Sequence, residues 1–404
     1  MLSSIASLTI LSLAWHPLVA GERASPDAGP ITLRGHEGRV EAIVFSPDGS
    51  ALLSVGRKEV RLWDVSLRIL RWKAEGAAYS FRRRHEHDPI AIFSANGRYL
   101  AVARESLEAA TIEVRDVATG KVGMMTFVDR FSCDRRMRMA FGPDSRVLAT
   151  ASTDGPDGAM PILWDASTGA RRLQMQGAPR ITYQLLFSAS GKILVGAGAD
   201  LKQARGQSGE LVPEVDKPSI ALWDPRDGTQ LLKIPYGHPW RGVALSPDET
   251  LLAITGASMT RLYSVPTGKV AGEWRGMGRD FLAFTPDGSS LIAAGYAGAS
   301  HVTVKTADVR SGKQHATFQR ANRTKRELPQ AVVFSLTGAL VGLLEDDGAA
   351  RVFDTTTGRE VGAFHGTESA LASMTFSADQ HWIAVAEESG LISLYSLRVP
   401  VTHN

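Results

Sequence analysis

One short phrase recurs eight times along this chain of 404 residues. Each copy is an apolar run, a polar turn and a second apolar run, which predicts two antiparallel strands joined by a tight turn. The copies begin at residues 44, 92, 140, 186, 244, 283, 333 and 375, and they read VFSPDGSALLSV, IFSANGRYLAVA, AFGPDSRVLATA, LFSASGKILVGA, ALSPDETLLAIT, AFTPDGSSLIAA, VFSLTGALVGLL and TFSADQHWIAVA. Self-similarity at a period of about 50 residues is typical of folds built from repeated units.

A second phrase follows each copy of the first. It reads VRLWDVSLRIL at residue 60, PILWDASTGAR at 161 and IALWDPRDGTQ at 220, with weaker copies after the other units. Alternating apolar and polar residues, an Asp at the end of the run and a Thr-Gly or Ser-Gly turn predict a third strand that enters a hairpin. A short apolar run then supplies a fourth strand in each unit.

Three Trp-Asp pairs, at Trp63, Trp164 and Trp223, end such third strands, and Gly-His pairs stand at His36 and His238. With these motifs the chain resembles the WD-repeat β-propeller family over residues 31–398. The resemblance implies an all-β fold, a single closed β-propeller of four-stranded antiparallel blades around a channel. Eight blades are expected, with seven as the alternative if one copy does not form.

The last unit lacks its own fourth strand, whereas ITLRGH at 31–36 has no unit before it. The N-terminal strand is therefore expected to complete the final blade and to close the ring, which removes exposed sheet edges. This organisation predicts one propeller domain over 31–398, preceded by a linker at 21–30 and followed by a C-terminal tail at 399–404.

The first 20 residues have the pattern of a signal peptide. An apolar run from Ile5 to Trp15 is too short to span a bilayer, and small residues at Ala14 and Ala20 offer cleavage points. No Lys or Arg precedes the run, which speaks against export. The expectation is a bacterial-type exported protein, periplasmic or extracellular; the alternative is a cytoplasmic protein with a frayed apolar N-terminus. No other segment has 18 consecutive apolar residues, so no transmembrane segment is expected in the mature chain.

In the family that the chain resembles, blades often carry a hydrogen-bonded set of His, Ser or Thr, Asp and Trp, which is structural. No blade is expected to hold the complete set, because GRKE at 56–59 replaces the Asp-bearing turn of the first blade. The residues assigned a structural role in the blades are His36, Ser54, Trp63, Asp64, Thr150, Asp154, Trp164, Asp165, Trp223, Asp224, His238 and Thr255.

The turns within the first phrase, and those after the third strand, hold nearly constant length. The connections on the opposite face vary, and one of them, at 199–219, is an insertion of about twenty residues whose order the sequence leaves open. In six of the variable connections Lys and Arg outnumber Asp and Glu by about three to one, although the whole chain has a net charge of only +3. A basic face is therefore predicted; scattered solvated charges are the alternative.

The partner-binding candidates on that face are Arg82, Arg83, Arg84, Arg135, Arg136, Arg138, Arg180, Trp240, Arg241, Arg279, Arg323 and Arg326. Trp240 is the aromatic anchor candidate, with an inter-blade core position as its alternative. His85 and His87 share one face of an extended segment and are weak metal candidates, since three adjacent arginines repel a cation. Cys133 is the only cysteine, which excludes an intrachain disulfide, and no cofactor motif is present.

These features favour a non-catalytic scaffold that binds another protein, of acidic character, through the variable basic face. Two alternatives remain open. One is an exported propeller enzyme, similar to lactonases or quinone-dependent dehydrogenases, with its site in the central channel; the apolar residues of the first strands disfavour it. The other is a binder of an acidic polymer, although the net charge of +3 falls short of that of a dedicated nucleic-acid binder.

Overall fold

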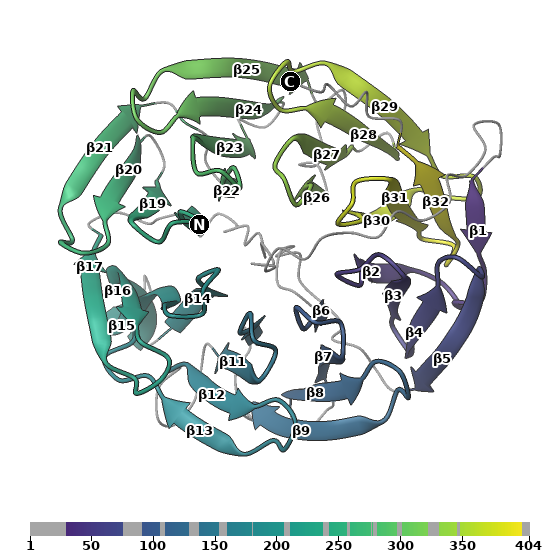
Figure 1. The fold of residues 1–404 in the computed structure, drawn as a ribbon, viewed down its shortest axis with the longest axis horizontal. Coiled ribbons are helices and arrows are strands. Elements are labelled where there is room, and N and C mark those ends of the chain that lie inside the picture. Colours follow the sequence, from purple (N-terminus) through teal and green to yellow (C-terminus); the bar gives the residue numbers. More distant parts are fainter. Residues whose placement is uncertain are drawn as a thin grey trace.

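Each of the eight repeats forms one four-stranded antiparallel sheet, and the sheets stand side by side in a ring (Figure 1). The computed structural model describes residues 30–75, 91–105, 110–128, 137–152, 160–179, 181–205, 211–236, 242–256, 259–275, 277, 281–296, 301–321, 331–345 and 348–397. Within those ranges the regular elements are all strands. The predictions of an all-β propeller and of eight blades are confirmed.

Blades are numbered along the chain, and their strands a to d run outwards from the channel. Blade 1 contains β2 (Val40–Phe45), β3 (Ala51–Gly56), β4 (Glu59–Asp64) and β5 (Ile69–Glu75); blade 2 contains β6 (Ala91–Phe93), β7 (Tyr99–Glu105), β8 (Ala110–Asp116) and β9 (Val122–Val128). Blade 3 contains β10 (Met137–Phe141), β11 (Val147–Ser152), β12 (Ile162–Asp165) and β13 (Arg171–Gln174); blade 4 contains β14 (Ile181–Phe187), β15 (Leu194–Arg205), β16 (Leu211–Trp223) and β17 (Gln230–Pro235). Blade 5 contains β18 (Gly242–Leu245), β19 (Leu251–Thr255), β20 (Met259–Ser264) and β21 (Val270–Arg275); blade 6 contains β22 (Phe281–Phe284), β23 (Ser290–Tyr296), β24 (His301–Asp308) and β25 (Gln314–Ala321). Blade 7 contains β26 (Ala331–Phe334), β27 (Leu340–Leu344), β28 (Ala349–Asp354) and β29 (Glu360–His365); blade 8 contains β30 (Leu371–Phe376), β31 (Trp382–Glu387), β32 (Ile392–Ser396) and, from the other end of the chain, β1 (Ile31–Leu33).

The ring is closed where β1 pairs with β32. Ile31 lies opposite Leu394 and Leu33 opposite Ile392 in an antiparallel ladder. Leu33 is buried in a cluster that also holds Trp63 of blade 1 and Leu394 of blade 8. The N-terminal strand therefore completes the last blade, as predicted. This junction of blades 8 and 1 is called the closing seam below.

The turn between strands a and b repeats because its polar side chains satisfy its backbone. In blade 1 the Asp48 carboxylate accepts hydrogen bonds from Ser46 Oγ at 2.6 Å and from the Ser50 backbone N–H at 3.1 Å. Gly49 adopts a φ of +71°, a left-handed conformation that favours glycine. Asp248 and Asp287 make the same pattern in blades 5 and 6. The recurring Pro-Asp-Gly phrase is thus a turn-forming signal.

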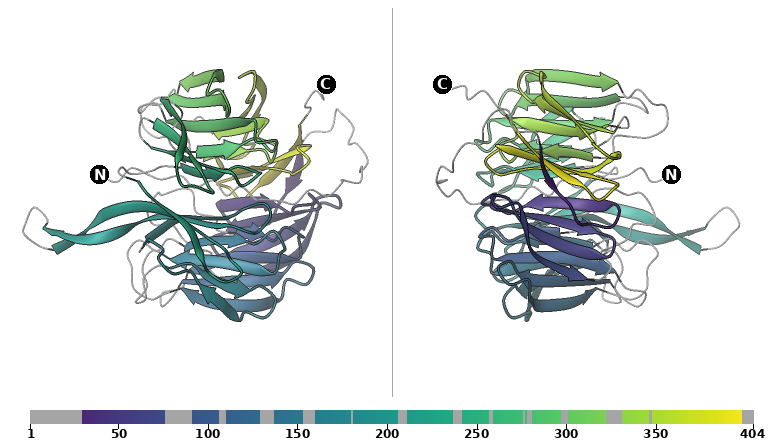
Figure 2. Two further views of the ribbon diagram at one scale, coloured as in Figure 1. Left: turned by 60° about the vertical axis from the view of Figure 1, so that its left-hand side comes forward. Right: turned by 90° about the vertical axis from the view of Figure 1, so that its right-hand side faces the viewer.

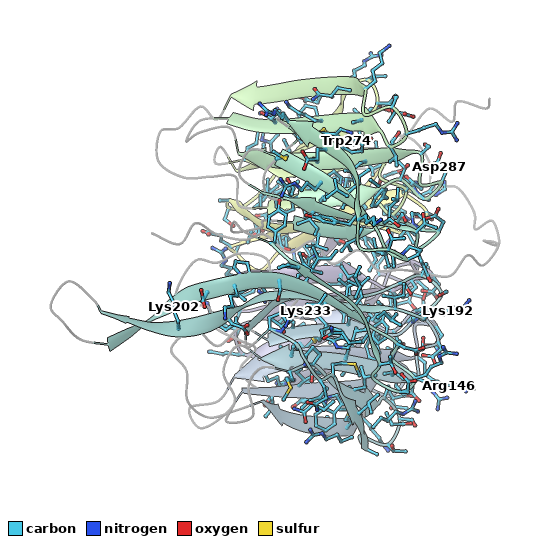
Figure 3. The ribbon with its side chains drawn as sticks, turned by 90° about the vertical axis from the view of Figure 1, so that its left-hand side faces the viewer. Arg146, Lys192, Lys202, Lys233, Trp274 and Asp287 are labelled. Atoms are coloured by element: carbon cyan, nitrogen blue, oxygen red, sulfur yellow. The ribbon has the colours of Figure 1, made fainter. Side chains whose placement is uncertain are left out.

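The two faces of the ring differ in their connections. The a–b and c–d turns open on one face, here called the lower face, and the b–c and d–a connections open on the other, the upper face. Figure 3 shows Arg146 and Lys192, both in a–b turns, on one side of the body and Lys202 far out on the other. Lys202 belongs to a long extension of β15 and β16 that projects well beyond the ring (Figure 2).

Candidate functional site

A chain of polar contacts crosses blade 1 between its strands. Trp63 Nε1 donates a hydrogen bond to Ser54 Oγ at 2.7 Å, and Ser54 Oγ lies 2.6 Å from His36 Nε2. The other ring nitrogen, His36 Nδ1, is 3.4 Å from Glu59 Oε1. Ser54 accepts from Trp63, so its own proton is available to His36 Nε2, and Nδ1 then carries the imidazole proton towards Glu59. The polar group of each member contacts another member of the set, so the set has a structural role.

Glu59 is the residue that sequence reasoning missed in this blade. Because GRKE lacks an Asp, the set was expected to be incomplete, but the glutamate at the start of β4 reaches the same imidazole. Burial and, to a smaller extent, the charge of Arg61 lower the pKa of His36 to about 4, against the opposing effect of Glu59. His36 is therefore neutral near pH 7.

The other blades keep fragments of this set. In blade 3, Trp164 Nε1 donates to Thr150 Oγ1 at 2.8 Å. In blade 4, Gly196 takes the place of the hydroxyl residue, and a Cβ there would lie 2.8 Å from the ring of Trp223. Trp223 Nε1 donates instead to the Gln176 backbone carbonyl, in the connection between blades 3 and 4, at 2.8 Å. Asp154 and His238 lie outside the described residues.

Thr255 lies one register position beyond the place that corresponds to Ser54. In blade 1 Trp63 pairs with Leu52, two residues before Ser54, whereas in blade 5 Tyr263 pairs with Leu252, three residues before Thr255. One residue reverses the face of a strand, so Thr255 instead accepts a hydrogen bond from Thr260 Oγ1 at 3.0 Å.

The Asp of each Trp-Asp pair is bound within its own c–d turn. Asp64 accepts from the Leu67 backbone N–H at 2.8 Å and pairs with Arg71 at 2.7 Å. These hydrogen bonds outweigh the opposing effect of burial and lower the pKa of Asp64 to about 2. The pKa values of Asp165 and Asp224 are also lowered, chiefly by hydrogen bonds within their own c–d hairpins. These carboxylates stabilise their turns. Because their pKa values are lowered, they are ionised near neutral pH and have no proton to donate.

A cavity of about 280 Å³ opens on the lower face between blades 3 and 4. Leu173 lines it, at the place where Trp72 and Trp274 pack against a c–d turn glycine in two other blades, so a smaller side chain accounts for the gap. Arg172 and Arg226 stand at its edge, but each pairs with the Asp that ends strand c of its own blade. The cavity therefore adds little net charge to the lower face.

Eleven of the twelve partner-binding candidates lie outside the described residues, and so do His85 and His87. The twelfth, Arg138, is buried, and its Nε donates to the backbone carbonyl of Tyr183 in the next blade. Gln184, at the same ring position in blade 4, donates through Nε2 to the Val243 carbonyl at 3.0 Å. Contrary to the prediction, Arg138 is a link between inner strands and is not presented to a partner.

The insertion at 199–219 forms a two-stranded ribbon on the upper face. The ladder between β15 and β16 continues from Gly198 opposite Ser219, through Asp200 opposite Asp216, to Arg205 opposite Leu211. The paired segments Asp200–Arg205 and Leu211–Asp216 are called the arm below. Blade 4 thus carries the largest departure from the repeat, and it lies on the face where the connections vary.

The described residues also limit the kind of site. In those ranges no group of three or more His, Cys, Asp and Glu side chains is arranged to hold a metal ion. In the same part of the chain, no helix has the length and apolar character needed to cross a membrane.

Eight four-stranded sheets in a ring, closed by the N-terminal strand, define a β-propeller. The family model for the "WD domain, G-beta repeat" matches residues 30–64. WD repeat and SOCS box-containing protein 1 is 31% identical over 121 residues in Takifugu rubripes and 26% identical over 225 residues in Danio rerio, matches that cover 29% and 53% of this chain. The chain spans only 23% and 46% of those two relatives. The chain is therefore an eight-bladed β-propeller whose first repeat matches the WD-repeat family model and which is similar to WD-repeat proteins.

A solved structure supports the architecture alone. The crystal structure of the computationally designed Ika8 protein matches with a TM-score of 0.63, covering 91% of this chain and 98% of the designed one. Sequence identity between the two is 15%, so the likeness concerns the fold.

Proposed function

We propose that this chain is a non-catalytic scaffold that binds another protein, of acidic character, through its upper face. WD-repeat proteins generally act as scaffolds for protein interactions, and the matched relatives are WD repeat and SOCS box-containing proteins. The observation that carries the proposal is the contrast between the faces. Lower-face turns repeat the same internally satisfied hydrogen bonds from blade to blade, whereas the arm departs from the repeat on the upper face and the Arg-rich stretches of the sequence fall between strand d of one blade and strand a of the next.

Charge within the upper face is uneven. Around the closing seam, Arg34 Nη1 pairs with Glu368 Oε1 at 2.7 Å and Arg39 Nη1 with Glu388 Oε1 at 2.9 Å, so positive charge there is neutralised. The Lys and Arg excess of the sequence lies in connections away from this seam, chiefly before blades 3 and 7. A partner with acidic side chains would be attracted to that part of the face.

The test compares two variants that lose the same number of positive charges. One changes six upper-face residues to Ser: Arg82, Arg83, Arg84, Arg135, Arg136 and Arg326. The other changes six exposed lower-face residues to Ser: Lys121, Arg146, Lys192, Lys269, Lys313 and Arg359. We expect proteins captured by the unchanged chain to be lost only from the upper-face variant, while both melt like the unchanged chain.

Two results would count against the proposal. Equal capture by both variants, or capture of nothing by the unchanged chain, would remove the basic face as a recognition surface and direct attention to the channel. Recovery of nucleic acid or anionic glycan with a steep salt dependence, and no defined protein, would favour the acidic-polymer alternative.

A further inference from the structure

The arm is a two-stranded ribbon without a neighbouring strand in the described part of the chain. Strand β14 pairs with β15 only as far as Ala199, and β17 pairs with β16 only from Ser219. Beyond those points β15 and β16 continue as a ladder of six cross-strand pairs. A two-stranded ribbon is marginally stable in water, and ordering each of its residues costs about 1–2 kcal/mol. An ordered arm therefore gains by acquiring a third strand.

The base of the arm has a specific geometry. Gly198 lies so close to the neighbouring strand β14 that a Cβ there would overlap the Ile181 backbone oxygen. The register shifts just beyond it, with an extra residue on β16, and Lys217 adopts a φ of +43°, a conformation that costs a non-glycine residue energy. Bulges and strained residues of this kind bend a ribbon to one side. The base of the arm therefore fixes the direction in which the arm leaves blade 4.

The two edges of the arm differ in their ability to bind a strand. Pro213 pairs with Gln203, and since proline has no N–H this pair must be one in which the backbone groups of both residues point outwards. Alternation then makes Leu201, Gln203 and Arg205 direct their N–H and C=O groups away from β16. On the β16 edge, Pro213 supplies no donor. The β15 edge has the complete row.

Charge and position favour the same edge. The β15 half of the arm contains Lys202, Arg205 and one acidic residue, whereas the β16 half contains Glu214, Asp216 and no basic residue. Lys202 is exposed (Figure 3). Because β15 follows the innermost strand in the sheet order, its open edge faces the channel side of the upper face and β16 faces outwards. The complete edge is thus also the more basic one.

We propose that the β15 edge of the arm docks an extended acidic segment of the partner protein, which adds a third strand by main-chain hydrogen bonds. This inference rests on the proposed function and names the part of the upper face that grips the partner. A second copy of the chain fits poorly, because pairing two β15 edges brings two basic strands together and the β16 edge lacks a donor at Pro213. An acidic extended segment meets complementary charge and a full row of donors.

The test uses two proline variants of one cross-strand pair, Leu201→Pro and Val215→Pro, in the full chain. Each removes one outward N–H, the first from the β15 edge and the second from the β16 edge, and neither interrupts the ladder of the arm. The probe is a capped nine-residue peptide of alternating Val and Glu, with a Val and Lys version as its charge control. Protection of the inward Lys202 and Ala204 amides from hydrogen exchange would show that each variant keeps its arm.

We expect the Glu peptide to bind the unchanged chain and Val215→Pro equally, and Leu201→Pro about tenfold more weakly. Binding should slow exchange of the outward amides of Leu201, Gln203 and Arg205, and the Lys peptide should bind about tenfold more weakly than the Glu peptide. Equal binding to all three proteins, protection elsewhere, or no binding to the unchanged chain would overturn the inference.

The same variants separate this inference from the proposed function. If partner proteins are lost from the six-serine upper-face variant but retained by Leu201→Pro, the scaffold function stands and docking on the β15 edge falls. The Glu peptide could instead bind at the β15 edge while no partner depends on the six upper-face arginines. Recognition through the basic connections would then be rejected, and docking on the β15 edge would be retained.

Discussion

The closing seam and the arm lie on opposite sides of the ring (Figure 1), and each joins two strands at a place where the repeat is broken. The seam ladder pairs only the three residues of β1 with β32, whereas the arm ladder has six cross-strand pairs. Yet the short ladder closes the whole ring and the long one stands apart from it. The difference lies in what surrounds each ladder, because packing and satisfied polar groups decide the stability of a strand pair more than its length.

The seam is surrounded on several sides. Leu33 is only 2% exposed, and the buried carboxylate of Glu387 accepts backbone hydrogen bonds from Thr367, Glu368 and Ser369 at 2.8–2.9 Å. This ties the connection between blades 7 and 8 to the b–c turn of blade 8. The arm has no comparable support in the described residues. We infer that the seam sustains the fold and that the arm is available for binding.

The largest effect is expected for Gly390→Ala at the seam. Gly390 has a φ of +94°, and a Cβ there would lie 2.5 Å from the His36 backbone oxygen and 2.8 Å from that of Gly38. Strained backbone and overlap with two carbonyl groups should lower the free energy of unfolding by about 4 kcal/mol, measured by urea denaturation. Gly123→Ala is the control, because its nearest neighbour is 4.0 Å away. A small loss at Gly390 would show that the seam yields easily, and would remove the contrast with the arm.

Glu387→Gln should follow, with a loss of about 3 kcal/mol at pH 7. Hydrogen bonds from three backbone N–H groups outweigh burial and lower the pKa of Glu387, so the carboxylate is charged. An amide places its NH₂ against donors that need an acceptor. Glu388→Gln, at the exposed neighbour, should cost less than about 1 kcal/mol in the same denaturation experiment. Similar losses in both variants would mean that the buried hydrogen bonds do not hold the connection between blades 7 and 8 against the seam blade.

His36 links the seam to pH. Its pKa is about 4 in the folded chain and 6.5 is the ordinary value, so below pH 6.5 the unfolded chain binds more protons than the folded one. The stability that neutral His36 contributes is therefore fully present above pH 6.5 and is lost as the pH falls from 6.5 through about 4, by about 3 kcal/mol. Denaturation series from pH 7 to 4 should show this slope in the unchanged chain and a flatter one in His36→Gln. Parallel slopes would assign the loss to other groups.

The fold could be predicted almost completely because it is repeated eight times. Turn residues such as Asp48 and Gly49 act locally, and closure by β1 followed from counting strands. Glu59 was missed because the expected residue was an Asp within the b–c turn. Glu59 stands instead at the start of β4, and its longer side chain brings the carboxylate to His36. The burial of Arg138 depends on the carbonyl of Tyr183, 45 residues away, which a local pattern does not contain. The arm could not be predicted from the sequence, because an insertion of this length can be ordered or disordered. The cross-strand register was needed to recognise it as a ribbon.

The smallest effect is expected at the base of the arm, for Lys217→Gly. Glycine adopts the left-handed conformation of Lys217 without the cost of a Cβ, so the arm should gain about 1 kcal/mol locally. Exchange of the Lys202 and Ala204 amides should slow about fivefold, while the urea midpoint of the whole chain stays unchanged, because the arm opens without the ring. Lys217→Ala retains the strained conformation and should leave exchange as it is. Slower exchange together with a higher midpoint would instead couple the arm to the ring, and the two regions would then differ in degree only.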